Sequence, residues 1–397
     1  MAGVLLRRVL LGLLALTTLA WLTAAASACP FCTMQGVTLT KDVSDASMVL
    51  YGTLTNAKLA AGDDGGGTTD LAIETAIKKH AILGDKKVFS VNKYLPPPTD
   101  VKDKFKYLLL FDVFKGKPDL IRLVVVKDGS DIVKYLQGAL DVQAKGQPAR
   151  LRFFFDYLDN ADIEISNDAY KEFGNADYKD YRDMAKKLPA DKLAKWLEDP
   201  NTPAFRYGLY ASLLAQCGQE KHGDLLRTKL DDPKFRVGSS IDGVFAGYVI
   251  LKPKDGWKYL RGILADPKQD FMFRYAALRA VRFFWDQRPD VLDKKQLVEG
   301  VGLLLDDGTI ADLAIEDLRK WQRWEMCGQV LGLFGKKSHD IPIVRRSILR
   351  YALSCPGKKA EEFVAAQRQR DKDWVNDVNE LLQLEIGAAS KPASASK

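Results

Sequence analysis

The sequence is poor in the residues from which catalytic and metal sites are usually built. It has 3 histidines and 5 cysteines among 397 residues, and the histidines, His80, His222 and His339, are far apart. It contains no HExxH zinc motif, no glycine-rich phosphate loop and no G-x-S-x-G nucleophile elbow. We therefore expect a protein that is not an enzyme and that needs no cofactor or metal.

Long apolar runs are also missing after the first 28 residues. Within those residues, Arg7 and Arg8 precede an apolar stretch at 9–22, and Ala26-Ser27-Ala28 follows it. This is the pattern of a cleaved signal peptide, and the stretch is too short to span a membrane comfortably. The sequence predicts export to the periplasm or the outside of the cell. Cleavage after Ala28 would make Cys29 the first mature residue. Lipid anchoring at Cys29 is therefore an open alternative, and we expect a membrane partner only if Cys29 carries a lipid.

Neither sign of charge dominates the chain. Lys and Arg number 59 against 52 Asp and Glu, a net charge of +7, and the two signs are interspersed. A nucleic-acid-binding protein would show a basic patch or stripe instead. We expect no nucleic-acid partner, and favour another protein or a component of the cell envelope.

Residues 46–127 have the alternation and composition of β-strands. Strands are predicted at 48–55, 69–77, 87–94, 106–114 and 120–127, where Val, Leu, Tyr and Thr are frequent and apolar and polar residues tend to alternate. A helix is predicted at 131–140, and Gly146-Gln147-Pro148 is a domain boundary. Five short strands favour a small antiparallel β-barrel with a closing helix over residues 29–145.

The start of this region resembles the netrin-like OB barrel of metalloproteinase-inhibitor modules. The resemblance rests on the opening Cys-x-x-Cys, the stretch "VLYGTLT" and a strand leading into "ETAIKKH". Those modules begin Cys-x-Cys and tie their cysteines to partners inside the barrel, whereas this region has only Cys29 and Cys32. Inhibitory activity is therefore not carried over, and an inhibitor-like β module on a helical stalk is kept as an alternative function.

The C-terminal two-thirds repeats the pattern Leu-x-x-Pro with an aspartate before the proline. It reads Leu197-Glu198-Asp199-Pro200, Leu230-Asp231-Asp232-Pro233 and Leu264-Ala265-Asp266-Pro267, with weaker copies at Leu158 and Leu305. Successive leucines are 39, 33, 34 and 41 residues apart. Repeats of this period are typical of stacked helical hairpins. Second helices are predicted to begin near Asp162, Pro203, Phe235, Asp270, Ile310, Ile341 and Asp371.

These units resemble HEAT repeats, in which a first helix, a turn and a second helix recur. The second helices open with matching segments, such as Phe205-Arg206-Tyr207 and Phe273-Arg274-Tyr275. The resemblance implies an α-solenoid over residues 148–386, followed by a disordered tail at 387–397. Within one second helix, Phe271, Tyr275, Leu278, Val281 and Trp285 fall on a single stripe. The predicted fold class is α+β, with more than one domain.

Arginine recurs near the start of the second helices, at Arg206, Arg236, Arg274 and Arg345. In a solenoid these helices line the concave face, so a row of guanidinium groups there is a candidate binding site for carboxylates of a partner protein. The alternative is that each arginine pairs with an acidic group of a neighbouring turn and holds the stack together.

Cys29-Pro30-Phe31-Cys32 is the one local motif with chemical potential. It predicts a structural disulfide or tether, a thiol–disulfide redox pair, or half of a metal site. Redox activity is kept as the second alternative function. Cys327 and Cys355 are candidates for another disulfide if their helices are antiparallel, the alternative being that they and Cys217 are free thiols. The leading prediction is an exported, non-enzymatic repeat protein that acts as a protein-binding scaffold.

Overall fold

The computed structural model describes residues 29–61, 66–96, 105–236 and 240–390. The predicted signal peptide therefore lies outside the described residues, as do residues 391–397 of the predicted tail. The chain forms two compact units, one of Phe31–Pro189 and one of Ala190–Lys397, with which the segment ending at Pro30 is grouped. We call them the sheet unit and the repeat unit.

The sheet unit contains the five strands that the sequence predicts, in the antiparallel order β3-β2-β1-β4-β5. β1 is the central strand and pairs with both β2 and β4. A core of Met48, Leu50, Leu71, Phe89 and Phe111 fills one face of the sheet. The bounds are β1 Met48–Leu59, β2 Gly67–Lys78, β3 Val88–Val91, β4 Phe105–Phe114 and β5 Lys117–Lys127, with a 3₁₀ turn η2 at Ala81–Leu83.

The sheet curls on itself but does not close into the predicted barrel. The rings of Phe89 on β3 and Phe111 on β4 lie 5.3 Å apart although two strands separate β3 from β4 in the order of pairing. A cavity of about 120 Å³ separates β3 from the start of β5, and the described strands form no ladder there. β3 has only 4 residues, and Pro118 at the start of β5 has no N–H to donate. Both features work against a closing ladder.

In the described part of the same unit, four helices follow the sheet and one helix, α2, precedes it. Helix α2 is not among the elements predicted from the sequence, and it is held by two buried carboxylates of α5. Asp168 accepts hydrogen bonds from the Leu39 N–H and, at 2.8 Å, from the Tyr135 hydroxyl, while Glu172 accepts from Thr38 Oγ1 at 2.6 Å. Burial raises the pKa of Asp168, against the effect of these hydrogen bonds. The helices are α2 Leu39–Asp45, α3 Ile132–Val142, α4 Gln147–Phe155, α5 Ile163–Gly174 and α6 Tyr178–Ala185, with η3 at Gln143–Lys145.

The division between the units falls after Pro189, whereas the predicted boundary lies at 146–148. The reason is that α5 supplies the carboxylates that hold α2, so residues on both sides of Gly146 belong to one set of contacts. Whether the segment 29–145 folds alone stays a prediction.

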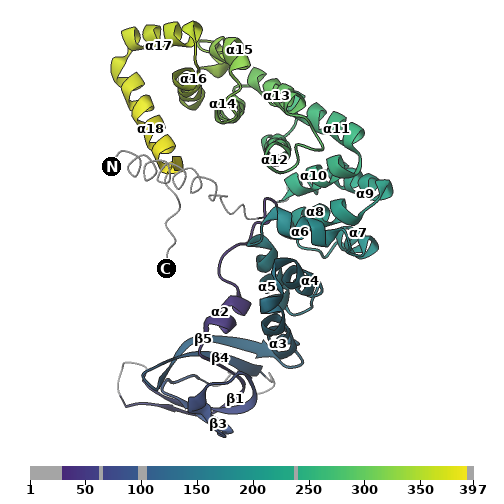
Figure 1. Ribbon diagram of the computed structural model, residues 1–397, viewed down its shortest axis with the longest axis vertical. Helices are drawn as coiled ribbons and strands as arrows, with labels where there is room; N and C mark the ends of the chain where they lie inside the picture. Colours follow the sequence, from purple (N-terminus) through teal and green to yellow (C-terminus); the bar gives the residue numbers. More distant parts are fainter. Residues whose placement is uncertain (1–28, 62–65, 97–104, 237–239, 391–397) are drawn as a thin grey trace, which may run out of the picture. The chain divides into compact units, whose positions relative to one another are not determined.

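The repeat unit consists of helices in pairs, and Figure 1 shows first members on one side and second members on the other. The predicted starts of the second helices are confirmed to within a few residues, except that α10 begins at Ile241 and not near Phe235. α18 also runs four residues into the predicted tail. The first members are α7 Ala190–Glu198, α9 Glu220–Asp231, α11 Pro253–Ala265, α13 Lys294–Gly302, α15 Cys327–Leu331 and α17 Lys358–Arg370. The second members are α8 Tyr207–Cys217, α10 Ile241–Leu251, α12 Phe271–Gln287, α14 Ala311–Lys320, α16 Pro342–Ser354 and α18 Lys372–Ser390, and short 3₁₀ turns occur at Ala204–Arg206, Leu303–Asp306, Trp324–Met326 and Lys337–His339.

In the four pairs that carry it, the repeated motif ends the first helix by one local mechanism. The aspartate takes an extended conformation, which a following proline favours, and its Oδ1 accepts the backbone N–H two residues later. This bond measures 2.8 Å at Asp199, 2.9 Å at Asp232, 3.0 Å at Asp266 and 3.0 Å at Asp307. The copy at Leu305 has Gly308 where the three full copies have proline, because a Cβ there would meet the Ser338 carbonyl oxygen at 1.9 Å.

Two successive second helices, α8 and α10, pack backbone against backbone. A Cβ on Gly243 would lie 2.5 Å from the Cα of Gly208, and one on Gly247 would lie 2.9 Å from the Ala211 carbonyl oxygen. Every residue of α10 from Ile241 to Val249 is buried. Small residues therefore set the spacing of this pair of repeats.

Candidate functional site

The Cys-x-x-Cys motif is oxidised. Cys29 and Cys32 are disulfide-bonded, and the other three cysteines are free. The chain beyond the motif is fixed to α5, since the Thr33 N–H donates to the Tyr170 hydroxyl at 3.3 Å and Gly36 exchanges two hydrogen bonds with Asn175. The first helix along the chain after the motif begins only at Leu39, so the motif does not itself open a helix, the arrangement that lowers the thiol pKa in redox motifs. These contacts favour a structural disulfide over a redox pair.

Two of the four predicted arginines make intramolecular contacts that hold turns together. Arg236 Nε donates to the Leu230 carbonyl at 2.8 Å, and Arg274 Nη2 donates to the Leu264 carbonyl at 3.0 Å. Both acceptors are the leucines of the repeated motif, whose carbonyls end the first helices. Arg274 also forms an ion pair with Asp307 of the next copy of the motif.

The other two arginines of the row are placed differently. Arg206 is buried near the Tyr210 hydroxyl, and Arg345 is exposed and lies 3.2 Å from Asp340. The four do not form one exposed row. The contacts of Arg236 and Arg274 favour the alternative that these two hold the stack. The partner-binding assignment stays a prediction. At the turn of Leu305, a histidine makes the contact that an arginine makes at Leu230 and Leu264. His339 Nε2 lies 2.8 Å from the Leu305 carbonyl oxygen, and no role is predicted for His339 from the sequence.

Cys327 and Cys355 lie next to each other as free thiols. Burial and a hydrogen bond with Cys327 raise the pKa of Cys355 to about 12. The two side chains therefore come together as the prediction requires, but the candidate disulfide is not formed. A protonated thiol is also a poor nucleophile for disulfide exchange.

A second set of charged residues, which the sequence analysis did not identify, links the second helices to one another. Three of the pairs join residues 34 to 37 positions apart and the fourth joins residues 66 positions apart. No local pattern marks them. The pairs are Arg279–Asp242 at 2.7 Å, Arg282–Asp317 at 2.8 Å, Arg350–Glu316 at 2.9 Å and Arg319–Glu385 at 2.8 Å. We call this set the interhelix ladder.

Asp242 is the most deeply buried carboxylate of the ladder. Its Oδ2 faces Arg279, while its Oδ1 is buried with no hydrogen-bond partner among the described residues. Burial raises the pKa of Asp242 to about 6, although Arg279 acts to lower it. A buried acceptor without a partner costs free energy.

Helix α12 exposes apolar residues beside the ladder. Phe271 is 44% and Met272 60% exposed, and the ring of Tyr275 stacks on that of Phe271 at 6.2 Å. The stripe predicted from the sequence is buried only in part, at Leu278 and Val281. The exposed residues of α12 recur at helical spacing and continue into Arg279 and Arg282. We call Phe271, Met272, Tyr275, Arg279 and Arg282 the α12 face.

Trp285 and Trp321 stack with ring centroids 4.1 Å apart at the ends of α12 and α14. Lys294 lies 4.6 Å from the Trp285 ring and Arg323 lies 5.3 Å from it. Both indole rings are half-buried and not part of the core. Their partners are each other and the two cations, so they hold neighbouring repeats together.

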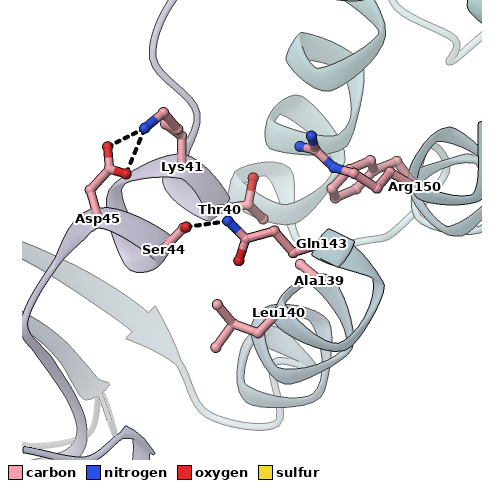
Figure 2. Close-up of a pocket in the computed structure, with 9 residues that line it drawn as sticks. Thr40, Lys41, Ser44, Asp45, Ala139, Leu140, Gln143 and Arg150 are labelled. Atoms are coloured by element: carbon pink, nitrogen blue, oxygen red, sulfur yellow. Dashed lines mark hydrogen bonds and ion pairs between the residues drawn. The ribbon is translucent and has the colours of Figure 1, made fainter. Parts of the chain in front are cut away.

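Among the described residues of the sheet unit there are further cavities, a pair of which adjoins its helices. One, of about 210 Å³, lies between α2, α3 and α4. Figure 2 shows that Lys41 turns toward Asp45 and that Ser44 meets Gln143, while Arg150 lies apart from them. Arg150 is itself paired with Glu172 at 3.0 Å. The charged groups that line this cavity therefore already have partners, which leaves little to bind a ligand.

The other cavity, of about 520 Å³, lies at the C-terminal end of β5. We call it the β5 cavity. Its walls come from β5, the turn after it and the first turn of α5. It is lined by Val125, Lys127, Asp128, Gly129, Ser130, Ala161, Asp162, Ile163 and Glu164.

Across the part of the chain that the structure describes, His, Cys, Asp and Glu side chains form no group that could hold a metal ion. No helix in the same residues combines the length and hydropathy needed to cross a membrane. Comparisons with protein-family models, with curated proteins and with solved structures found no match.

Proposed function

We propose that this protein is an exported, non-enzymatic scaffold that binds another protein, or a protein component of the cell envelope, through the second helices of its repeat unit. The paired helices and their common turn support a HEAT-like solenoid, and the curled sheet supports a relationship to OB-type barrels in shape. The oxidised Cys29–Cys32 pair supports an oxidising compartment.

The observation that carries the proposal is the α12 face. It combines exposed aromatic and methionine side chains with two partly exposed guanidinium groups on one helix. Aromatic residues, Met and Arg are the residues enriched where proteins bind one another. The opposite face of α12 is buried, so the exposed face is held rigidly and loses little conformational entropy on binding.

The test is site-specific photo-crosslinking in the organism that makes the protein. A photoreactive amino acid at Met272 should give one defined crosslinked product, to be identified by mass spectrometry. The matched control places the same group at Lys258, an exposed position on the first helix α11, where no such product is expected.

A second variant separates recognition from stability. Phe271→Ser with Tyr275→Ser should reduce the Met272 crosslink at least about ten-fold, the effect of losing interface anchors, while the melting temperature stays nearly unchanged. Equal crosslinking at Met272 and Lys258, or an unchanged yield in the double variant, would contradict the proposal. Export is tested separately, by the mass of the mature N-terminus, which should begin at Cys29.

A further inference from the structure

β5 is an edge strand, and its second half is open. It pairs with β4 on one side, and no described strand pairs with it on the other. Its first half faces β3 across a small cavity and contains Pro118, which blocks pairing there. From Val124 to Lys127 there is no proline, and no further described strand pairs with this segment. The Lys127 carbonyl accepts the Ser130 N–H at 3.2 Å, so the outward backbone groups up to the Lys127 N–H are those open to another chain.

The β5 cavity adjoins this open edge and exposes apolar surface. Val125 is 50% and Ile163 68% exposed, and both line it. Its walls are fixed by local hydrogen bonds: Ser130 donates to Asp162, and the Glu164 N–H donates to Asp162 at 3.0 Å. The cavity is therefore a preformed depression.

Charge in the β5 cavity indicates what would enter it. Three carboxylates, of Asp128, Asp162 and Glu164, line it against one cation, Lys127. Asp162 is committed to Ser130 and to capping α5, whereas Asp128 and Glu164 are exposed and form no ion pair among the described residues. A partner with both apolar and basic side chains complements this lining.

We propose that the open edge of β5 and the β5 cavity bind an extended segment of another protein, which adds to the sheet as a further strand. The segment carries apolar and basic residues at every second position with small polar residues between them, because successive side chains of a strand point to opposite faces and only every second one can enter the cavity. An apolar side chain packs against Val125 and Ile163, and a basic one approaches Asp128 and Glu164. Backbone hydrogen bonds supply affinity, and the cavity supplies specificity. This surface belongs to the sheet unit and does not depend on the α12 face.

The test uses the full mature chain and fluorescence anisotropy of labelled eight-residue peptides. A Val–Lys peptide, in which Val and Lys take turns at every second position with Thr between them, should bind at least about ten-fold more tightly than the matching Val–Glu peptide, by charge complementarity. The same Val–Lys peptide with N-methyl groups on alternate residues keeps its side chains but loses one row of backbone donors. It should also bind at least about ten-fold more weakly, since strand addition relies on those donors.

Matched variants locate the site. Asp128→Lys with Glu164→Lys should weaken Val–Lys binding about ten-fold and favour the Val–Glu peptide. Asp85→Lys, an exposed charge change in the same unit outside the strands, should leave both affinities unchanged. Circular dichroism and thermal melting confirm that each variant is folded.

Three results would overturn the proposal. The first is equal binding of the N-methylated peptide, which would mean that the edge is not used. The second is an equal effect of Asp85→Lys, which would indicate general charge attraction. The third is a dimer in sedimentation analysis that Val125→Lys dissociates, since a second copy of the chain would then occupy the edge.

Discussion

At the residue scale, the Asp242–Arg279 pair places a carboxylate where water hardly reaches it. Burial raises the pKa of Asp242 to about 6, above roughly 3.9 in an unfolded chain. The folded protein therefore binds this proton more tightly than the unfolded one. The group's contribution to the free energy of unfolding is greatest below about pH 4 and declines as the pH rises through 6.

Asp242→Asn should remove this decline. At each pH, the quantity to compare is the free energy of unfolding of the unmodified protein minus that of the variant. This difference should be roughly 3 kcal/mol smaller at pH 7.5 than at pH 3.5, the value that corresponds to the difference between the two pKa values of Asp242. Urea denaturation at a series of pH values measures it. A difference that stays constant with pH would mean that Asp242 is not buried as described.

Arg274 and Arg345 both lie near the start of a second helix, but Arg274 is buried and the side chain of Arg345 is 44% exposed. Arg274→Ala leaves Asp307 and the Leu264 carbonyl without their partner in a buried setting, and removing one member of a buried ion pair costs about 3–5 kcal/mol. We expect its melting temperature to fall by roughly 10 °C. Arg345→Ala, which removes only an exposed pair, should change stability by less than about 0.5 kcal/mol.

Thermal melting and partner binding of the two arginine variants decide whether the predicted arginines bind a partner or hold the repeats together. If both variants melt like the unmodified protein, Arg274 does not hold the repeat together. Loss of partner binding in Arg345→Ala at an unchanged melting temperature would support the partner-binding assignment at that position.

At the element scale, the repeated turn shows what local sequence can predict. An aspartate before a proline is enough to end a helix, because the carboxylate bonds to a backbone N–H only two residues away and the proline disfavours helical geometry. The strands can be predicted for the same reason, because the alternation of apolar and polar residues is also a local pattern. The interhelix ladder and α2 cannot be predicted in this way, because each depends on partners far away along the chain, such as Asp242 with Arg279 or Leu39 with Asp168.

Helix spacing gives the next prediction. Gly243→Ala forces a methyl group against the Gly208 backbone and should destabilise the repeat unit by about 1–3 kcal/mol, the usual cost of overpacking. Gly262→Ala is the matched control. Its Cβ would meet nothing within 4 Å, so the better helix propensity of alanine should stabilise the protein by about 0.5–1 kcal/mol.

Urea denaturation of both glycine variants should therefore give shifts of opposite sign. If Gly243→Ala is neutral, α8 and α10 do not pack backbone to backbone.

At the scale of the whole molecule, the division into units can be tested with fragments. Residues 31–189 and 190–390 should each be soluble and unfold cooperatively, since each unit has its own core. A fragment of residues 29–145, cut at the boundary predicted from the sequence, lacks the carboxylates that hold α2. It should melt at a lower temperature than residues 31–189, by circular dichroism. Equal melting temperatures would favour the sequence-based boundary.

The carbonyl contacts of the motif leucines also imply an order of assembly. The turn at Leu264 is completed by Arg274, which in turn needs Asp307, and the turn at Leu305 is completed by His339. Each of these partners lies later in the chain. During synthesis, when the N-terminus emerges first, the newest turn always waits for residues that have not yet appeared. The repeat unit is thus suited to close progressively from its N-terminal end, each arriving segment locking the one before it.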